Sequence, residues 1–286
     1  MKFVLMTICL IRIALAQPVD PSKLHAPVAP VSIFKSTCFS DVCLGDDLNK
    51  IGGLKITWLS EATRNTRYHP LNPQNVRDAQ KAFRGLTDAD YKVLAGSIYF
   101  SGTSDENINI ILPPIVHIEI NDATLPILKK ATTCTATLPV HGIFKSESGH
   151  YTSVLLLSDN GRLRVVKAAR RWMPNFPATA TDAQKDQMAN QQLGELSQQI
   201  NDAYGAFWHA DGGTVNRTTN FSARSKDAVA YLDTRDMAHP VMTFYTATFA
   251  AFAKSDSPWD AAIAGYERAL ANTPGCAVAT PTLKIN

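Results

Sequence analysis

The sequence predicts an α+β protein in which helices pack on an antiparallel β-meander, with a mainly helical part toward the C-terminus. Two hairpin turns between residues 138 and 172 predict the meander. Helix-capping residues and apolar residues at helical spacing on either side of it predict the helices. Of the 286 residues, 45% are hydrophobic and 19% are charged. This composition excludes a disordered chain, a fibrous repeat and a protein with many membrane spans.

The first 16 residues have the pattern of a secretory signal peptide. A basic residue precedes an apolar run, and Ala14-Leu15-Ala16 offers the small side chains that cleavage before Gln17 requires. The alternatives are a buried N-terminal strand or a membrane anchor. Pro18 ends the apolar run before the roughly 20 residues that an anchor needs. We therefore expect a mature chain that begins at Gln17 and has no membrane span.

The rest of the chain divides by composition. Residues 17–30 carry four prolines and predict an extended arm. Residues 31–172 are expected to form the α+β part with the antiparallel sheet. The segment 170–181 contains two prolines and is expected to link this part to a mainly helical part at 181–286. The two parts are expected to pack as one unit.

Short elements are expected before the meander. A strand at 31–39, a turn feeding a short helix that ends at Gly52-Gly53, and a strand at 54–59 come first. Asn72-Pro73 then caps and opens a helix, and Thr87 with Asp90 forms a capping box for another. The alternation between residues 115 and 120 predicts a half-buried strand.

The meander is expected to consist of strands at about 138–145, 150–159 and 162–171. Asn160-Gly161 is a strong two-residue hairpin signal, because both residues tolerate positive φ. This turn predicts that Leu157 faces Arg164 and that Leu155 faces Val166. Apolar residues occupy both faces of the middle strand, so the sheet is expected to be covered on both sides.

Three helices are expected after the linker. Thr181 with Gln184 caps a long amphipathic helix that continues to about residue 211. A strand is expected around 228–232. His239-Pro240 is expected to start a second helix, and Ser257-Pro258 is expected to start the last one.

Four cysteines remain after the leader, and an even number in an exported chain indicates disulfides. Cys38 and Cys43 are close enough in sequence to close a small loop, which leaves Cys134 to pair with Cys276. The alternative is four free buried thiols. The spacing of Cys38 and Cys43 and the lack of a nearby histidine pair argue against a zinc site.

The first hairpin supplies the two candidate catalytic histidines, His141 and His150. If Lys145 lies opposite His150, both histidines point to one face and stand roughly 13 Å apart, too far to share a metal. Either could act as a base beside a carboxylate. The simpler interpretation is two half-exposed histidines that are dispensable. No serine-nucleophile motif accompanies them.

Weaker binding candidates lie further along the chain. Trp208 and His209 end the long predicted helix, where a ligand site or a simple stop signal are the alternatives. Arg162 and Arg164 begin a basic strand that could bind an anionic ligand or form a solvated face. Nothing resembles a phosphate loop, a dinucleotide fingerprint or a metalloprotease motif, so no cofactor and no metal is predicted.

These patterns favour an exported, non-catalytic binding protein, periplasmic if bacterial and secreted otherwise. Its partner would be an unknown protein or an envelope component. The formal charge is +3, and Lys2 and Arg12 belong to the leader, so a nearly neutral mature chain is not expected to bind nucleic acid. The alternative is a hydrolase of unfamiliar pattern that uses His141 or His150 with a carboxylate. Glycosylation sequons at Asn216 and Asn220 would apply only in a eukaryotic secretory pathway.

Overall fold

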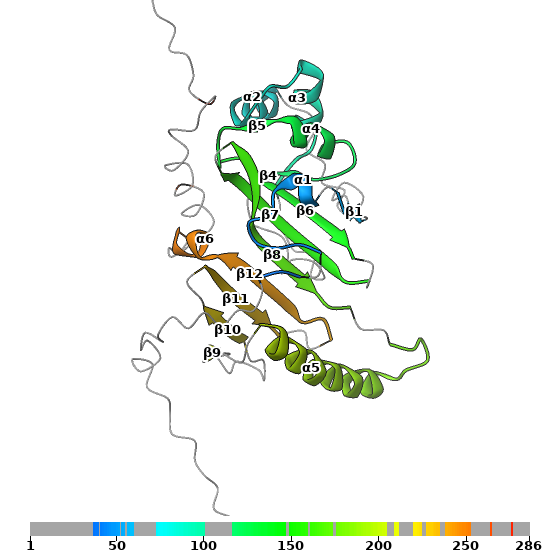
Figure 1. The fold of residues 1–286 in the computed structure, drawn as a ribbon. Coiled ribbons are helices and arrows are strands. Elements are labelled where there is room, and N and C mark those ends of the chain that lie inside the picture. The colour runs from blue at the N-terminus through cyan, green and yellow to red at the C-terminus, as the bar shows by residue number, and fades with distance from the viewer. Residues whose placement is uncertain are drawn as a thin grey trace, which may run out of the picture. The chain divides into compact units, whose positions relative to one another are not determined.

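The computed structural model describes most of the chain between residues 37 and 252 (Figure 1). The expected leader and proline-rich arm lie outside the described residues, as does nearly all of the helix expected after Ser257-Pro258. The described residues are 37–39, 41–51, 53–54, 56–59, 73–100, 116–146, 149–159, 161–173, 176–204, 209–211, 220–224, 227–234, 238–252, 264 and 276.

One large mixed β-sheet organises the described residues. Its strands are β1 (Thr57–Leu59), β3 (Ile98–Phe100), β4 (Val116–Glu119), β6 (Val140–Lys145), β7 (Tyr151–Asp159), β8 (Arg162–Arg171), β9 (His209–Asp211), β10 (Asn220–Arg224), β11 (Ala228–Asp233) and β12 (Val241–Thr246). Nine of the ten strands follow the order β3-β4-β6-β7-β8-β12-β11-β10-β9, and β1 pairs with β6 beside this path. The described pairs of this sheet are antiparallel except β4 with β6, which are parallel.

The predicted fold class is therefore wrong. The sheet does not end with the meander but continues from β8 through β12, β11, β10 and β9, which occupy much of the part expected to be helical. The parallel pairing of β4 with β6 also makes the sheet mixed. The described residues show few helices beside this sheet.

The segment 241–246 explains the error. Val241, Phe244 and Phe249 fit a helical period, but Met242 and Phe244 also fit the alternation of a strand, and a run this short satisfies both patterns. β-branched and aromatic residues dominate these six positions, and β8 and β11 offer backbone partners on both sides. The chain becomes helical only at α6 (Ala247–Phe252), where alanines begin.

The three strands of the predicted meander form, with one irregularity. Leu157 lies opposite Arg164, as the turn predicts. A β-bulge between Leu155 and Leu156 then shifts the register, so that Leu155 faces Lys167 instead of Val166. The bulge brings the Lys167 side chain onto a buried face of the sheet.

The other helices are α1 (Leu48–Ile51), α2 (Pro73–Ala82), α3 (Asp88–Ala95), α4 (Leu125–Lys130) and α5 (Asp182–Tyr204). The predicted capping boxes form at α3, between Thr87 and Asp90, and before α5, between Thr181 and Gln184. Figure 1 shows α2, α3 and α4 near the β4 end of the sheet and α5 near its other end. None of the helices in the described ranges has the length and apolar character of a membrane span.

The main hydrophobic core lies on one face of the sheet. Phe144, Val154 and Phe244 point into it from three strands, and α1 to α4 contribute apolar residues over the same face. Leu196 of α5 belongs to this core. A smaller cluster of Ile143, Ala169 and Val241 lies on the opposite face.

Two disulfides join the pairs that the sequence predicts, Cys38 with Cys43 and Cys134 with Cys276. The first closes a loop over a sequence separation of 5 residues, whereas the second spans 142. A second, two-stranded sheet pairs β2 (Phe83–Arg84) with β5 (Thr132–Thr133), directly before Cys134.

Candidate functional site

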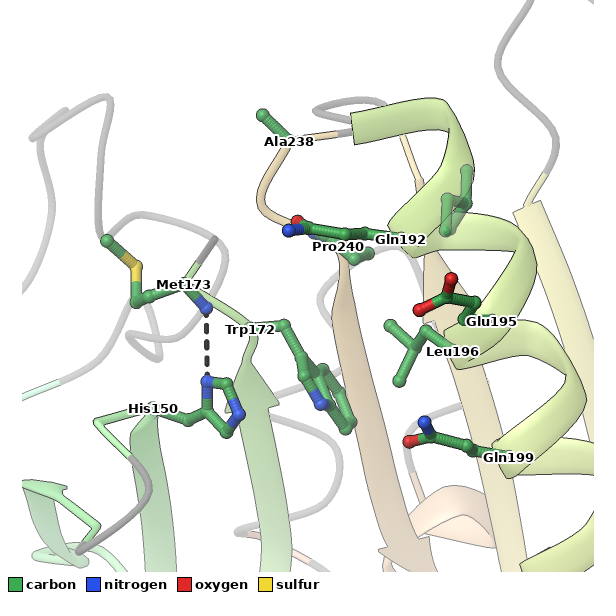
Figure 2. Close-up of a pocket in the computed structure, with 10 residues that line it drawn as sticks. His150, Trp172, Met173, Gln192, Glu195, Leu196, Gln199, Ala238 and Pro240 are labelled. Carbon is green, nitrogen blue, oxygen red and sulfur yellow. Dashed lines mark hydrogen bonds between the residues drawn. The ribbon is translucent and has the colours of Figure 1, made fainter. Parts of the chain in front are cut away.

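A cavity of about 200 Å³ lies between the end of β8 and one face of α5 (Figure 2). His150, which precedes β7, and Trp172, which follows β8, line one side of it. Gln192, Glu195 and Gln199 line the side formed by α5. This is a concave site with one aromatic wall and several polar groups, the combination typical of small-molecule pockets.

The α5 wall follows from helical spacing. Gln192, Glu195, Leu196 and Gln199 recur at intervals of three and four residues, so they share one face of the helix. Leu196 is buried and attaches this face to the main core. The core contact therefore directs the neighbouring amides and carboxylate toward the cavity.

His150 is held in one tautomer. The backbone N–H of Met173 donates to its Nδ1 at 3.2 Å, so the proton of the neutral ring is on Nε2. Nε2 lies on the side of the ring that faces Trp172 (Figure 2). Burial, and secondly the positive charge of Arg170, lower the pKa of His150 below its usual value of 6.5. His150 thus offers a neutral N–H donor rather than a free base.

Trp172 connects the cavity to the core. Its ring centroid lies 6.0 Å from that of His150 and 6.2 Å from that of Phe39, which meets it edge to face. The backbone N–H of Trp172 donates to the carbonyl oxygen of Pro240 at 3.1 Å. These contacts fix the aromatic wall between β8 and β12.

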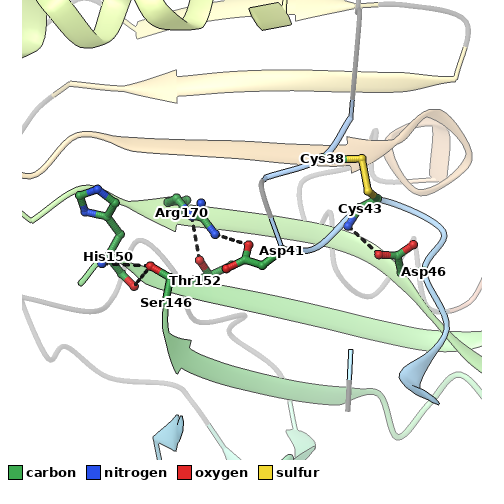
Figure 3. Close-up of polar contacts among 8 residues, drawn as sticks. All are labelled: Cys38, Asp41, Cys43, Asp46, Ser146, His150, Thr152 and Arg170. Carbon is green, nitrogen blue, oxygen red and sulfur yellow. Dashed lines mark hydrogen bonds and ion pairs between the residues drawn. A yellow bond between two sulfur atoms is a disulfide. The ribbon is translucent and has the colours of Figure 1, made fainter. Parts of the chain in front are cut away.

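Arg170 extends from β8 toward Asp41 and Thr152 (Figure 3). Its guanidinium forms an ion pair with Asp41, and its Nε donates to Thr152 Oγ1 at 2.9 Å. The side chains of Arg170 and Asp41 are only 7% and 18% exposed. The same guanidinium lies 4.7 Å from the centre of the Phe39 ring.

The opposite face of the sheet carries a buried polar cluster of His117, Glu119 and His141. Glu119 and His141 are register partners on the parallel strands β4 and β6. The imidazole centroids of His117 and His141 are 4.9 Å apart, edge to face. The three residues are at most 2% exposed. The structure thus makes Glu119 the neighbour of His141 on the adjacent strand, and the hydrolase alternative needs a carboxylate near this histidine.

Lys167 lies on the same face as this cluster, two strands away. It is 4% exposed, and its Nζ lies 5.6 Å from the centre of the Tyr245 ring. Burial lowers its pKa from 10.5 to about 8. The β-bulge opposite Leu155 and Leu156, where β8 carries the extra residue Val166, brings this lysine onto that face.

The expected geometry of the two candidate histidines is wrong. Tyr151, not His150, is the register partner of Lys145, so His141 and His150 belong to opposite faces of the sheet. His141 is 1% exposed, so it is also not half-exposed. His150 is half-buried at the cavity.

The basic residues of β8 differ in exposure, because the first ones lie at the surface and the later ones are buried. Arg162 is exposed and lines a second cavity of about 410 Å³, together with Lys129 and Asp47. Arg164 donates to the carbonyl of Gly45 and pairs with Asp159. The later basic residues of β8 are not a solvated face. Lys167, Arg170 and Arg171 are at most 5% exposed.

His209 begins the short strand β9, where its backbone pairs with Ser222. Trp208 lies outside the described residues. Within the described residues, no three His, Cys, Asp or Glu side chains are grouped to hold a metal ion. Comparisons with protein-family models, curated proteins and solved structures find no match.

Sequence reasoning misses most of the cavity. Trp172 lies at the end of a predicted strand, next to a proline-containing segment. This pattern indicates the end of a secondary-structure element and does not indicate a ligand site. Gln192, Glu195 and Gln199 occupy the polar positions of an amphipathic helix, which ordinarily face water. Of the residues that line the cavity, only His150 is a candidate from the sequence, because it is a histidine next to a predicted hairpin turn.

Proposed function

We propose that this protein is an exported, non-catalytic binding protein whose cavity at His150 and Trp172 holds one small uncharged ligand rich in hydroxyl groups. A single sugar ring is the simplest such ligand. The observation that carries the proposal is the fixed Nε2–H donor of His150 beside the Trp172 ring, opposite the polar face of α5.

The residues that line the cavity favour an uncharged ligand with several hydroxyl groups. Gln192 and Gln199 can each donate and accept hydrogen bonds, which suits hydroxyl groups that do both. Trp172 offers an apolar surface for the C–H face of a ring. Glu195 disfavours an anion, and the residues that line the cavity in the described structure include no lysine or arginine.

The size of the cavity supports a ligand of one ring. Its volume of about 200 Å³ is smaller than the roughly 300–1,000 Å³ typical of pockets for drug-sized molecules. The ligand would be recognised as a small molecule or as one exposed residue of a larger envelope glycan. Export fits the two disulfides, which persist in oxidising compartments. N-terminal sequencing of exported protein should find Gln17 first.

The binding test is calorimetric titration with a panel of neutral monosaccharides, sugar acids and amino sugars. We expect a neutral sugar to bind, and Gln199→Ala and Trp172→Ala each to weaken it about tenfold or more. Gln198→Ala is the matched control, because Gln198 is exposed and bonds to Asp202 on the same helix. Binding of none of the neutral sugars, or equal affinity in Gln199→Ala, would overturn the proposal.

A second candidate is acid–base hydrolysis at His141, favoured by the register pairing of His141 with Glu119. A carboxylate beside an imidazole can orient it and stabilise its protonated form. Its weakness is that both side chains are at most 2% exposed. Hydrolysis of chromogenic esters or glycosides that is lost in Glu119→Gln, while the melting temperature is retained, would favour this candidate over binding alone.

A further inference from the structure

The loop from Cys38 to Cys43 is a strap across the core face of the sheet, closed by its own disulfide (Figure 3). Phe39 and Val42 form two backbone hydrogen bonds with each other. The two residues are 2% and 0% exposed. Phe39 is the apolar anchor of the strap, with its ring 5.1 Å from Phe244 and 6.2 Å from Trp172. The strap therefore supports the aromatic wall of the cavity from behind.

Asp41 is the polar anchor of the same strap. It forms an ion pair with Arg170, whose positive charge acts on His150 at the cavity. The two anchors thus connect the strap to both residues on the β8 side of the cavity, Trp172 through packing and His150 through Arg170. No contact with α5 is needed for this connection.

The disulfide can be opened without detaching the chain that follows it. Gly45 donates to the carbonyl of Val165, and Val165 donates to the carbonyl of Asp46, so this next stretch is tied to β8 independently. Cys38 and Cys43 are both half-buried, so neither residue is fully enclosed by the protein. Opening the disulfide would leave the strap held only by its non-covalent contacts, which include the Asp41–Arg170 ion pair and the backbone bond from Leu44 to Thr37, while the sheet stays paired.

We propose that the Cys38–Cys43 disulfide holds the cavity in its binding form and that its reduction by a thiol switches the cavity to a weaker-binding form. The S–S bond breaks, two cysteine thiols form, and two thiol groups of the reductant are oxidised to a disulfide. Loss of the short loop constraint raises the conformational entropy of the strap and withdraws Phe39 and Asp41 from Trp172 and Arg170. This regulation rests on the proposed binding function.

The test follows the indole N–H signal of Trp172 by NMR in the full chain, assigned with Trp172→Phe. We expect dithiothreitol to shift this signal and increase its solvent exchange in the wild type. Cys38→Ser/Cys43→Ser should show the shifted signal without reductant, and any smaller response to dithiothreitol that it keeps is assigned to the Cys134–Cys276 bond. An unchanged Trp172 signal in the double variant, or the same dithiothreitol response in both proteins, would overturn the proposal.

A second variant keeps the test decisive if the double variant does not fold. Phe39→Ala retains the disulfide but removes the apolar anchor, so it should shift the Trp172 signal without reductant. An unshifted signal in this variant contradicts the proposal. A neutral monosaccharide that binds the wild type should bind Cys38→Ser/Cys43→Ser about tenfold more weakly. If no sugar binds the wild type, the proposed function fails, whereas the Trp172 signal still decides whether the strap controls the cavity.

Discussion

Asp41 and Arg170 are 129 residues apart in the sequence and form an ion pair between two largely buried side chains. Arg170 also donates to Thr152 and lies over Phe39, so this guanidinium joins the strap to β7 and β8. A buried charge is costly without its partner. The pair therefore contributes to holding the N-terminal loop on the sheet.

Asp41→Asn should destabilise the protein by about 2–3 kcal/mol, because it leaves the Arg170 charge buried with less compensation. Urea unfolding monitored by circular dichroism measures this. Asp159→Asn is the matched control. It removes the partner of Arg164 in a pair whose side chains are 41% and 47% exposed, so it should cost less than about 1 kcal/mol. Equal losses of unfolding free energy in the two variants would contradict the burial of the Asp41–Arg170 pair.

Lys167→Met should stabilise the protein near pH 7, and the gain should shrink as the pH rises from 8 to 10.5. Burial lowers the pKa of Lys167 to about 8. Between the two pKa values the unfolded chain holds a proton that the folded chain has lost, so the wild type gains stability with rising pH. The expected gain at pH 7 is about 1–3 kcal/mol. Urea unfolding across pH 7 to 10.5 measures it, and Lys81→Met, at an exposed position, should show no such trend.

Gly142→Ala should destabilise the protein by about 1–3 kcal/mol. A Cβ at this position would collide with the Trp58 ring and lie 3.0 Å from the Cβ of Ile120. Gly194→Ala is the opposite case, because a Cβ there meets nothing within 4 Å inside α5. It should stabilise the protein by about 0.5–1 kcal/mol, and thermal unfolding of both variants compares them. Destabilisation by Gly194→Ala would contradict the position of Gly194 inside helix α5 with open space around it.

His141→Ala should cost about 1–3 kcal/mol, because it removes a ring that is 1% exposed and packed against His117. His150→Ala should cost less than about 1 kcal/mol, since His150 is half-buried at the rim of the cavity. This replaces the expectation that both histidines are dispensable. Chemical unfolding of the two variants side by side distinguishes the buried from the half-buried position.

Removing the Cys134–Cys276 bond should lower the melting temperature more than removing Cys38–Cys43. The longer bridge spans 142 residues and the shorter one 5. The chain-entropy model gives about 5 and about 2 kcal/mol respectively, as upper values. Calorimetry of the two serine double variants measures the order, and a larger loss from the short bridge would contradict it.

Local signals predicted the parts of the fold that depend on a few adjacent residues. Thr87 with Asp90 predicted the start of α3, and Asn160-Gly161 predicted the β7–β8 turn. The bulge beside Leu155 was not predictable, because apolar residues on both faces of β7 do not specify a register.

The sheet beyond β8 and the site were less accessible to sequence reasoning. Val241 to Thr246 satisfied the helical and the strand patterns, and pairing with β8 and β11 decided between them. The contact of Asp41 with Arg170 and the approach of Trp172 to α5 depend on the tertiary fold, so no local pattern encodes them.

The most direct test of ligand binding in the cavity is an NMR titration of the wild-type protein with neutral monosaccharides. We predict that the Trp172 indole signal and the His150 imidazole signals shift together and saturably with one of these sugars, and that Gln199→Ala weakens the response. A panel that leaves both residues unshifted, or a shift at Trp172 that Gln199→Ala does not alter, would contradict the account.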